Sequence, residues 1–139
     1  MAYVSKNGIY SGVNIGCNKC KIISYQPNGK KVVKSGKVFN QGYITFELED
    51  GTRVKQYLLI APWNTFLFYK LIKSTKDEFN IINECNNFDY TQIIGKEVVI
   101  EIDGGFNGIT PYYDVTNIYN IEEGEKIIEY ENSQRELGF

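Results

Sequence analysis

Residues 42–60 read Gly-Tyr-Ile-Thr-Phe-Glu-Leu-Glu-Asp-Gly-Thr-Arg-Val-Lys-Gln-Tyr-Leu-Leu-Ile, and this stretch decides the fold class. In its first half, Ile44, Phe46 and Leu48 alternate with polar or amphipathic side chains, which is the period of a strand with one buried face. Asp50-Gly51 is a strong tight-turn signal, and residues 52–60 return as a second strand. The sequence therefore predicts a β-hairpin over residues 37–60.

A long strand is expected before this hairpin, over residues 9–25. Gly12 and Gly16 within it indicate a bulge or a strong bend, and the register shifts near residues 20–22. Residues 26–36 are rich in Lys, Gly and other polar residues, which predicts a loop between the two strands.

The pattern after the hairpin changes from strand to helix. Pro62 ends the strand, and from Trp63 the apolar residues follow spacings of three and four. We expect this helix to plug the open end of a barrel, although its apolar side chains could instead line a ligand pocket. These side chains are Trp63, Phe66, Leu67, Phe68 and Leu71. Residues 78–92 give no clear pattern.

A closing hairpin is predicted from strands 96–103 and 112–121, joined by a glycine-rich loop at 104–108. The whole order is three strands, one helix and two strands. It predicts a mainly β protein with a five-stranded OB-like Greek-key barrel and one helix between strands three and four. We expect residues 1–121 to form this domain. Residues 122–139 would be an acidic C-terminal tail, either flexible or carrying a short helix over residues 127–135.

The charge of the chain is divided between its two parts. Residues 1–60 hold nine Lys or Arg against three acids, a net charge of +6, whereas residues 61–139 hold six against fourteen, a net charge of −8. Aromatic residues are interleaved with the basic ones in the first part. Cations for phosphates and flat rings for unstacked bases are what a single-stranded nucleic acid requires.

Catalysis is not expected. The chain has no histidine, which removes the commonest general base and the commonest zinc ligand. The acids Glu97, Glu101, Asp103 and Asp114 accompany no nucleophile and no phosphate-binding loop. We therefore predict a protein without enzyme activity, cofactor or metal. The chain has no apolar run of membrane-spanning length and no signal-peptide pattern, so it is expected in the cytoplasm and away from membranes.

Cys17-Asn18-Lys19-Cys20 resembles half of a zinc ribbon. A structural zinc needs four ligands, and the second pair is missing, so two ordinary thiols on a strand are expected. The odd total of three cysteines fits a reducing compartment.

The middle and end of the chain resemble small phage-encoded single-stranded-DNA-binding proteins. The resemblance lies in Ile94-Gly95-Lys96 before the fourth strand, and in Asn107-Gly108 through Tyr112-Tyr113 leading into the fifth. It implies an OB fold, single-stranded DNA as ligand, and a role in phage DNA replication or recombination in the host cytoplasm.

Twelve residues are predicted to bind nucleic acid. They are Lys19, Lys21, Lys30, Lys31, Lys34, Lys37, Arg53 and Lys55 for phosphates, and Tyr25, Phe39, Tyr43 and Tyr57 for bases. The acidic tail carries Leu137-Gly138-Phe139 and resembles the acidic, Phe-terminated tail of bacterial single-stranded-DNA-binding proteins, which implies that Leu137 and Phe139 contact replication or repair proteins. An acidic terminus without a partner is the alternative.

Two other functions fit the same sequence. The chain could be a small phage-type inhibitor or anti-defence protein that binds a host protein through its acidic half, as a mimic of nucleic acid. It could also be a structural or regulatory protein that uses the barrel to form homo-oligomers.

Overall fold

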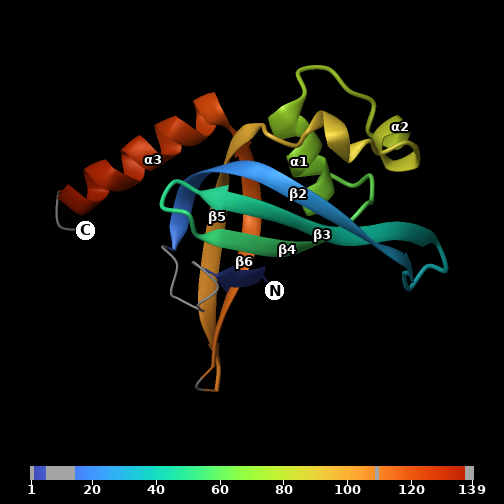
Figure 1. The fold of residues 1–139 in the computed structure, drawn as a ribbon, viewed down its shortest axis with the longest axis horizontal. Helices are drawn as coiled ribbons and strands as arrows, with labels where there is room; N and C mark the ends of the chain where they lie inside the picture. Colours follow the sequence, from blue (N-terminus) through green and yellow to red (C-terminus); the bar gives the residue numbers. More distant parts are fainter. Residues whose placement is uncertain (1, 6–14, 109, 137–139) are drawn as a thin grey trace.

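The computed structural model describes residues 2–5, 15–108 and 110–136, and the strands of this part of the chain close into one antiparallel barrel (Figure 1). The strands are β1 (Ala2–Ser5), β2 (Gly16–Val32), β3 (Val38–Leu48), β4 (Arg53–Leu59), β5 (Glu97–Asn107) and β6 (Thr110–Asn120). Around the barrel they follow the order β1-β4-β3-β2-β5-β6.

The mainly β barrel is confirmed, but the prediction of five strands is wrong, because the described residues contain six. The additional strand is β1, which pairs with β4 over all four of its residues and meets β6 where Ala2 lies opposite Tyr113. Four residues are too few for an alternating pattern to stand out, so β1 depends on pairing with distant strands. Residues 9–14, with which the predicted first strand begins, lie outside the described residues.

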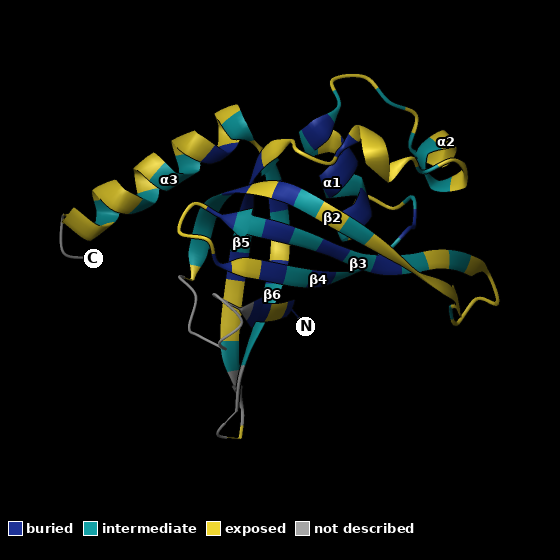
Figure 2. Cartoon of the chain, in the orientation of Figure 1, coloured by how far each residue is buried: buried dark blue, intermediate teal, exposed yellow. Residues whose placement is uncertain are grey.

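The central hairpin of β3 and β4 forms as predicted, with Tyr43 opposite Tyr57 and Phe46 opposite Val54. Successive residues along a strand point to opposite faces of the sheet. Ile44, Phe46 and Leu58 are consequently buried in the core, and the residues between them face outward (Figure 2).

The predicted loop at 26–36 is mostly strand. β2 runs to Val32 and pairs with β3 as far as Val32 opposite Val38, with an irregularity between Pro27 and Lys30. Ile22 still bonds to Gly95 and Lys96, but beyond Ile22 β2 pairs with β3 and not with β5, so one of its edges is open there. An open edge tolerates the missing N–H of Pro27, which explains how a turn-like sequence is accommodated in a strand.

The β5–β6 hairpin is also longer than predicted. Gly104 and Gly105 lie in β5, opposite Tyr113 and Tyr112, instead of in a loop. A Cβ at Gly105 would come within 2.8 Å of the Tyr112 hydroxyl. Glycine is therefore used here for close approach of a ring and not for a turn.

Two helices and a 3₁₀ turn connect β4 to β5, where one helix was predicted. They are α1 (Leu67–Thr75), α2 (Ile81–Asn86) and η1 (Tyr90–Gln92). Phe68 and Leu71 of α1 are fully buried, which confirms the helix as part of the core. Trp63 and Phe66 precede α1 and are exposed, so their predicted place in the core is wrong. Among the described residues, no helix is both long and apolar enough to cross a membrane.

Residues after β6 form a third α-helix in the described part of the chain, α3 (Ile121–Glu136), which lies against β2, β5 and β6 (Figure 1). Of the two alternatives for the acidic tail, a flexible segment or a short helix over 127–135, the described residues contain a helix, and it starts earlier, at Ile121. Gly124 is buried, and a Cβ there would lie 2.2 Å from the Cβ of Val99 on β5. The Glu131 carboxylate accepts a hydrogen bond from the Cys17 backbone N–H at 3.2 Å.

Gly124→Ala is expected to destabilise the protein. Alanine favours helices by up to about 1 kcal/mol over glycine, but here its methyl group would overlap Val99, and overpacking costs about 1–3 kcal/mol. Chemical denaturation followed by circular dichroism would measure the difference. Asn132→Ala, at an exposed position of the same helix, is the control. A Gly124→Ala protein as stable as that control would contradict close packing of α3 on β5.

Candidate nucleic-acid interface

The outward side of β3 and β4 carries paired tyrosines and lysines. Tyr43 and Tyr57 are cross-strand neighbours with ring centroids 6.0 Å apart. The Lys55 ammonium lies 4.9 Å from the Tyr43 ring centre, and the Lys31 ammonium of β2 lies 5.9 Å from that of Tyr57. Each cation is thus close to a ring, as a site for alternating phosphates and bases requires.

The same surface continues in both directions. Toward the β2–β3 hairpin, Phe39 contacts the Trp63 ring at 5.3 Å between centroids, and the Lys37 ammonium lies 5.9 Å from the Trp63 ring centre. Toward β1, Tyr3 is opposite Lys55 and 59% exposed. The eight residues that we call the aromatic–lysine face are Tyr3, Lys31, Lys37, Phe39, Tyr43, Lys55, Tyr57 and Trp63.

The central rings are held in place by neighbouring groups. The Tyr57 hydroxyl donates a hydrogen bond of 2.7 Å to Gln41 Oε1, and the Gln41 amide nitrogen donates one of 3.0 Å to the Asn28 carbonyl. Burial, the main cause, and the neighbouring Tyr43 raise the pKa of Tyr57. A preoriented ring loses less entropy when a base stacks on it.

Two members of this face, Tyr3 and Trp63, were not predicted to bind nucleic acid. Trp63 was assigned to the core because it continues the helical spacing of the residues after it. The helix begins only at Leu67, so Trp63 lies in the segment before it and its helical spacing to later residues does not place it on the buried face. The sequence around Tyr3 does not indicate a place in this face. Tyr3 lies opposite Lys55 only because β1 pairs with β4, about fifty residues later in the chain.

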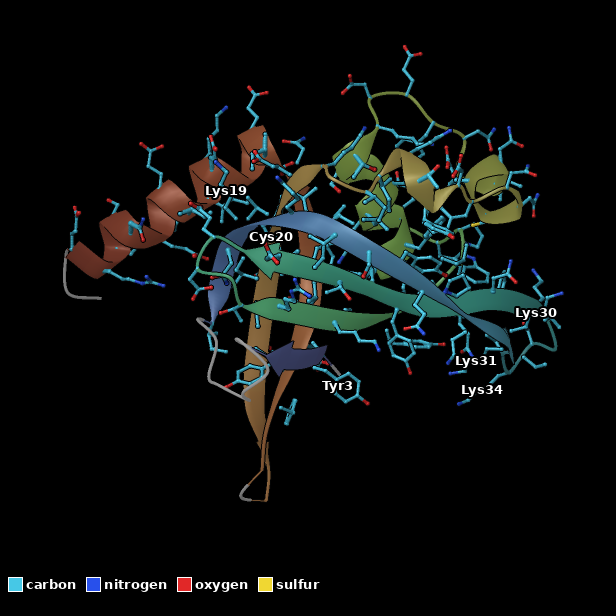
Figure 3. The ribbon with its side chains drawn as sticks, in the orientation of Figure 1. Tyr3, Lys19, Cys20, Lys30, Lys31 and Lys34 are labelled. Carbon is cyan, nitrogen blue, oxygen red and sulfur yellow. The ribbon has the colours of Figure 1, made fainter. Side chains whose placement is uncertain are left out.

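Lys19 and Lys21 do not join the aromatic–lysine face. Lys19 forms an ion pair of 3.3 Å with Glu125 of α3, which raises the pKa of Lys19. Lys21 lies between strands, opposite Glu47 on one side and Glu97 on the other. Figure 3 shows Lys19 beside α3 and Lys30, Lys31 and Lys34 at the far end of the long hairpin. From residue 19 to residue 30 the strand covers about 35 Å at ~3.3 Å per residue.

The remaining predicted residues divide between several places. Arg53 pairs with Glu47 at 3.2 Å and is therefore partly neutralised. Lys34 is exposed in the turn of the hairpin, and Lys30 and Tyr25 line a groove on the side of α2. Tyr25 packs edge-on against Phe88 at 5.2 Å, and burial raises its pKa. Leu137 and Phe139 lie outside the described residues.

The two cysteines of the Cys-x-x-Cys segment point to different surroundings. Cys20 is buried in the core, and its thiol donates a hydrogen bond to the Val98 carbonyl at 3.6 Å, whereas Cys17 is half-buried beside Glu131. Desolvation raises the pKa of each thiol to about 12, with Glu131 adding to the effect at Cys17. In the described part of the chain, no three His, Cys, Asp or Glu side chains are grouped so as to hold a metal ion.

These thiols predict a loss of stability at alkaline pH. The unfolded chain releases the thiol protons near their ordinary pKa, about 8.5, but the folded protein retains them to about 12. Raising the pH through this interval therefore favours the unfolded state. The free energy of unfolding, measured with denaturant under reducing conditions, should fall across this range. A Cys17→Ala, Cys20→Ala double variant should show a shallower fall, and an equally steep one would contradict the assignment.

No protein-family model matches this chain, and no curated protein is significantly similar to it. The resemblance to phage single-stranded-DNA-binding proteins consequently stays a prediction from the residues.

Proposed function

We propose that this protein is a non-enzymatic, OB-type barrel that binds single-stranded DNA with little sequence preference in phage DNA replication or recombination. The observation that carries the proposal is the aromatic–lysine face, in which three lysines alternate with five exposed or half-exposed rings across β1, β3, β4 and the hairpin.

The order of strands supports an OB-type barrel. With β1 set aside, β2, β3, β4, β6 and β5 follow one another around the barrel, and α1 lies between β4 and β5 along the chain. This is the connectivity of the five-stranded Greek-key barrel. OB folds bind oligonucleotides on the face of their second and third strands and on the loop between the first two. The corresponding elements are β3, β4 and the β2–β3 hairpin, where the aromatic–lysine face lies.

The chemistry of this face favours a single strand over a duplex. Stacking of a base on an aromatic ring contributes about 1–3 kcal/mol per base, but a paired base has no free face to offer. Lysines contribute through phosphate contacts and the release of counterions. If about four phosphates are neutralised, the logarithm of the association constant should fall with the logarithm of salt concentration with a slope near −3.

The variant Lys31→Gln, Lys55→Gln is expected to weaken binding to a labelled oligo-dT. Loss of two phosphate contacts should reduce the salt slope by about 1.4 and the affinity by roughly 10- to 30-fold at ~0.1 M salt. Fluorescence anisotropy at several salt concentrations measures both quantities.

The matched control is Lys19→Gln, Lys21→Gln, which removes the same charge from the part of β2 near Glu125, Glu47 and Glu97. Its affinity should stay close to that of the wild type. Equal losses in the two variants would show that only the total charge matters, and would contradict the assignment to the aromatic–lysine face. Absence of wild-type binding at low salt would overturn the proposed function itself.

Trp63 provides an independent test, because it is the one tryptophan of the chain and is 41% exposed. A base stacking on its indole should quench its fluorescence, and saturation of the quenching should coincide with the anisotropy curve. Trp63→Phe should retain part of the affinity without the signal. If oligonucleotide binds with no change in tryptophan emission, Trp63 does not belong to the binding surface.

The inhibitor alternative is favoured by one observation. Helix α3 exposes five of its acidic side chains, namely Glu122, Glu123, Glu125, Glu129 and Glu136. A basic host protein could bind there, and such binding would be insensitive to the Lys31, Lys55 variant. Glu125 and Glu131 are engaged within the molecule, which leaves less of the helix for an external partner.

A further inference from the structure

A groove separates the outer half of the β2–β3 hairpin from α2 and η1. It consists of two adjoining hollows of about 400 and 370 Å³, which share Lys30, Asn40, Ile60 and Asn86 in their walls. Volumes of this size are typical of sites for small organic groups. The aromatic–lysine face does not account for this groove, apart from Phe39, which belongs to both.

One wall of the groove is aromatic. Tyr25 lies 5.2 Å from Phe88 and 5.3 Å from Tyr90, measured between ring centroids. Phe88 in turn packs edge-on against the buried Phe68 at 5.1 Å, so the cluster is anchored to the core. Tyr90 is 37% exposed. The groove therefore offers an aromatic surface that is fixed from behind and accessible from outside.

The rim of the groove carries carboxamides with unused hydrogen-bonding groups. Within the described residues, the side chains of Asn40, Asn86 and Asn87 make no hydrogen bond to another protein group, although all three line the groove. Gln41 differs, because both ends of its amide are occupied by Tyr57 and Asn28. A carboxamide offers a donor and an acceptor side by side, which is the pattern on the edges of nucleobases.

The hairpin connects this groove to the aromatic–lysine face. Lys30 is opposite Asn40 and Lys31 is opposite Phe39 in the register of β2 and β3. Side chains that are neighbours in sequence along a strand point to opposite faces, so Lys30 lines the groove while Lys31 lies by Tyr57. Phe39 lines the second hollow and also contacts Trp63. A nucleic-acid strand leaving the face at Trp63 would enter the groove next to Phe39.

We infer that the groove between the β2–β3 hairpin and α2 binds one nucleobase of the same single strand, stacked on the Tyr25–Tyr90 wall and hydrogen-bonded at its edge by Asn40 and Asn87, with Lys30 on the flanking phosphate. This inference rests on the proposed function and adds to it a site that reads base edges. The face stacks any base, whereas the groove requires a base with a hydrogen-bonding edge.

Nuclear magnetic resonance of the side-chain amides tests this contact directly. In ¹⁵N-labelled protein, the signals of Asn40, Asn87 and Asn83 are assigned by their disappearance in the corresponding alanine variants. Asn83 is exposed on α2 outside the walls of the groove, which makes it the internal control. Two ligands of about 15 nucleotides are compared, a length suited to one OB fold: a mixed-sequence DNA strand, and a strand of abasic sugar–phosphate units.

The Asn40 and Asn87 signals should shift with the mixed-sequence strand, stay in place with the abasic strand, and leave Asn83 unmoved in both cases. The Asn40→Ala, Asn87→Ala variant should lose about tenfold in affinity for the mixed strand and nothing for the abasic one. If the mixed strand binds with unmoved Asn40 and Asn87 signals, the groove is not a base site, and the proposed function stands without it. If no strand binds to the wild type, the proposed function fails and the inference fails with it.

Discussion

The period-two alternation along β3 and β4 is the constraint on which the rest of this structure depends. It places Ile44, Phe46 and Leu58 in the core and leaves Tyr43, Lys55 and Tyr57 outside. A slip of one residue would exchange the two sets, burying lysine and exposing the core phenylalanine, so core and surface select the same register. The turn reinforces this register, because the Gly51 N–H donates to the Leu48 carbonyl and the Thr52 N–H donates to the Asp50 carboxylate. The same hydrogen bonds that stabilise the hairpin therefore align the aromatic–lysine face.

The opposite charges of the two parts of the chain meet at one end of the barrel. Helix α3 packs through Gly124 onto β5 and brings Glu125 to Lys19 and Glu131 to the start of β2. The acids of α3 thereby lie near the first lysines of β2, and α3 is remote from the lysines of the hairpin (Figure 3). Since screening limits surface charges to about 10 Å at ordinary salt, α3 does not neutralise the hairpin. Lys19 at the start of β2 is therefore paired with an acid, whereas Lys30, Lys31 and Lys34 of the hairpin form no ion pair among the described residues.

Local patterns predicted the β3–β4 hairpin and the buried part of α1, whereas β1 and the strand over residues 26–32 depend on long-range contacts that local patterns do not show. The β3–β4 hairpin follows from apolar residues at every second position, and the buried part of α1 follows from apolar residues spaced by three and four. Both patterns lie within a few neighbouring residues. By contrast, Lys19 looked like part of a continuous basic groove, because its partner Glu125 is more than a hundred residues away. Pro27-Asn28-Gly29 looked like a turn, because the open edge of β2 that accommodates it exists only in the assembled sheet. For the site, Phe39, Tyr43, Lys55 and Tyr57 were predicted individually, but their sharing of one face with Tyr3 and Trp63 depends on strand order, which composition does not encode.

The outer half of the β2–β3 hairpin has an open strand edge and also carries lysines of the groove and of the aromatic–lysine face. An open strand edge exposes unpaired backbone groups and invites pairing with other sheets, a hazard that proteins reduce with proline and lysine on the edge. Pro27, Lys30 and Lys31 lie in this part of β2 and therefore protect the edge. The same lysines point alternately to the groove and to the aromatic–lysine face, because strand geometry sends neighbours to opposite sides. A nucleic-acid strand that follows these lysines around the hairpin would cover both sides of it. The lysines that prevent pairing with another sheet would then also guide this nucleic acid from the aromatic–lysine face into the groove.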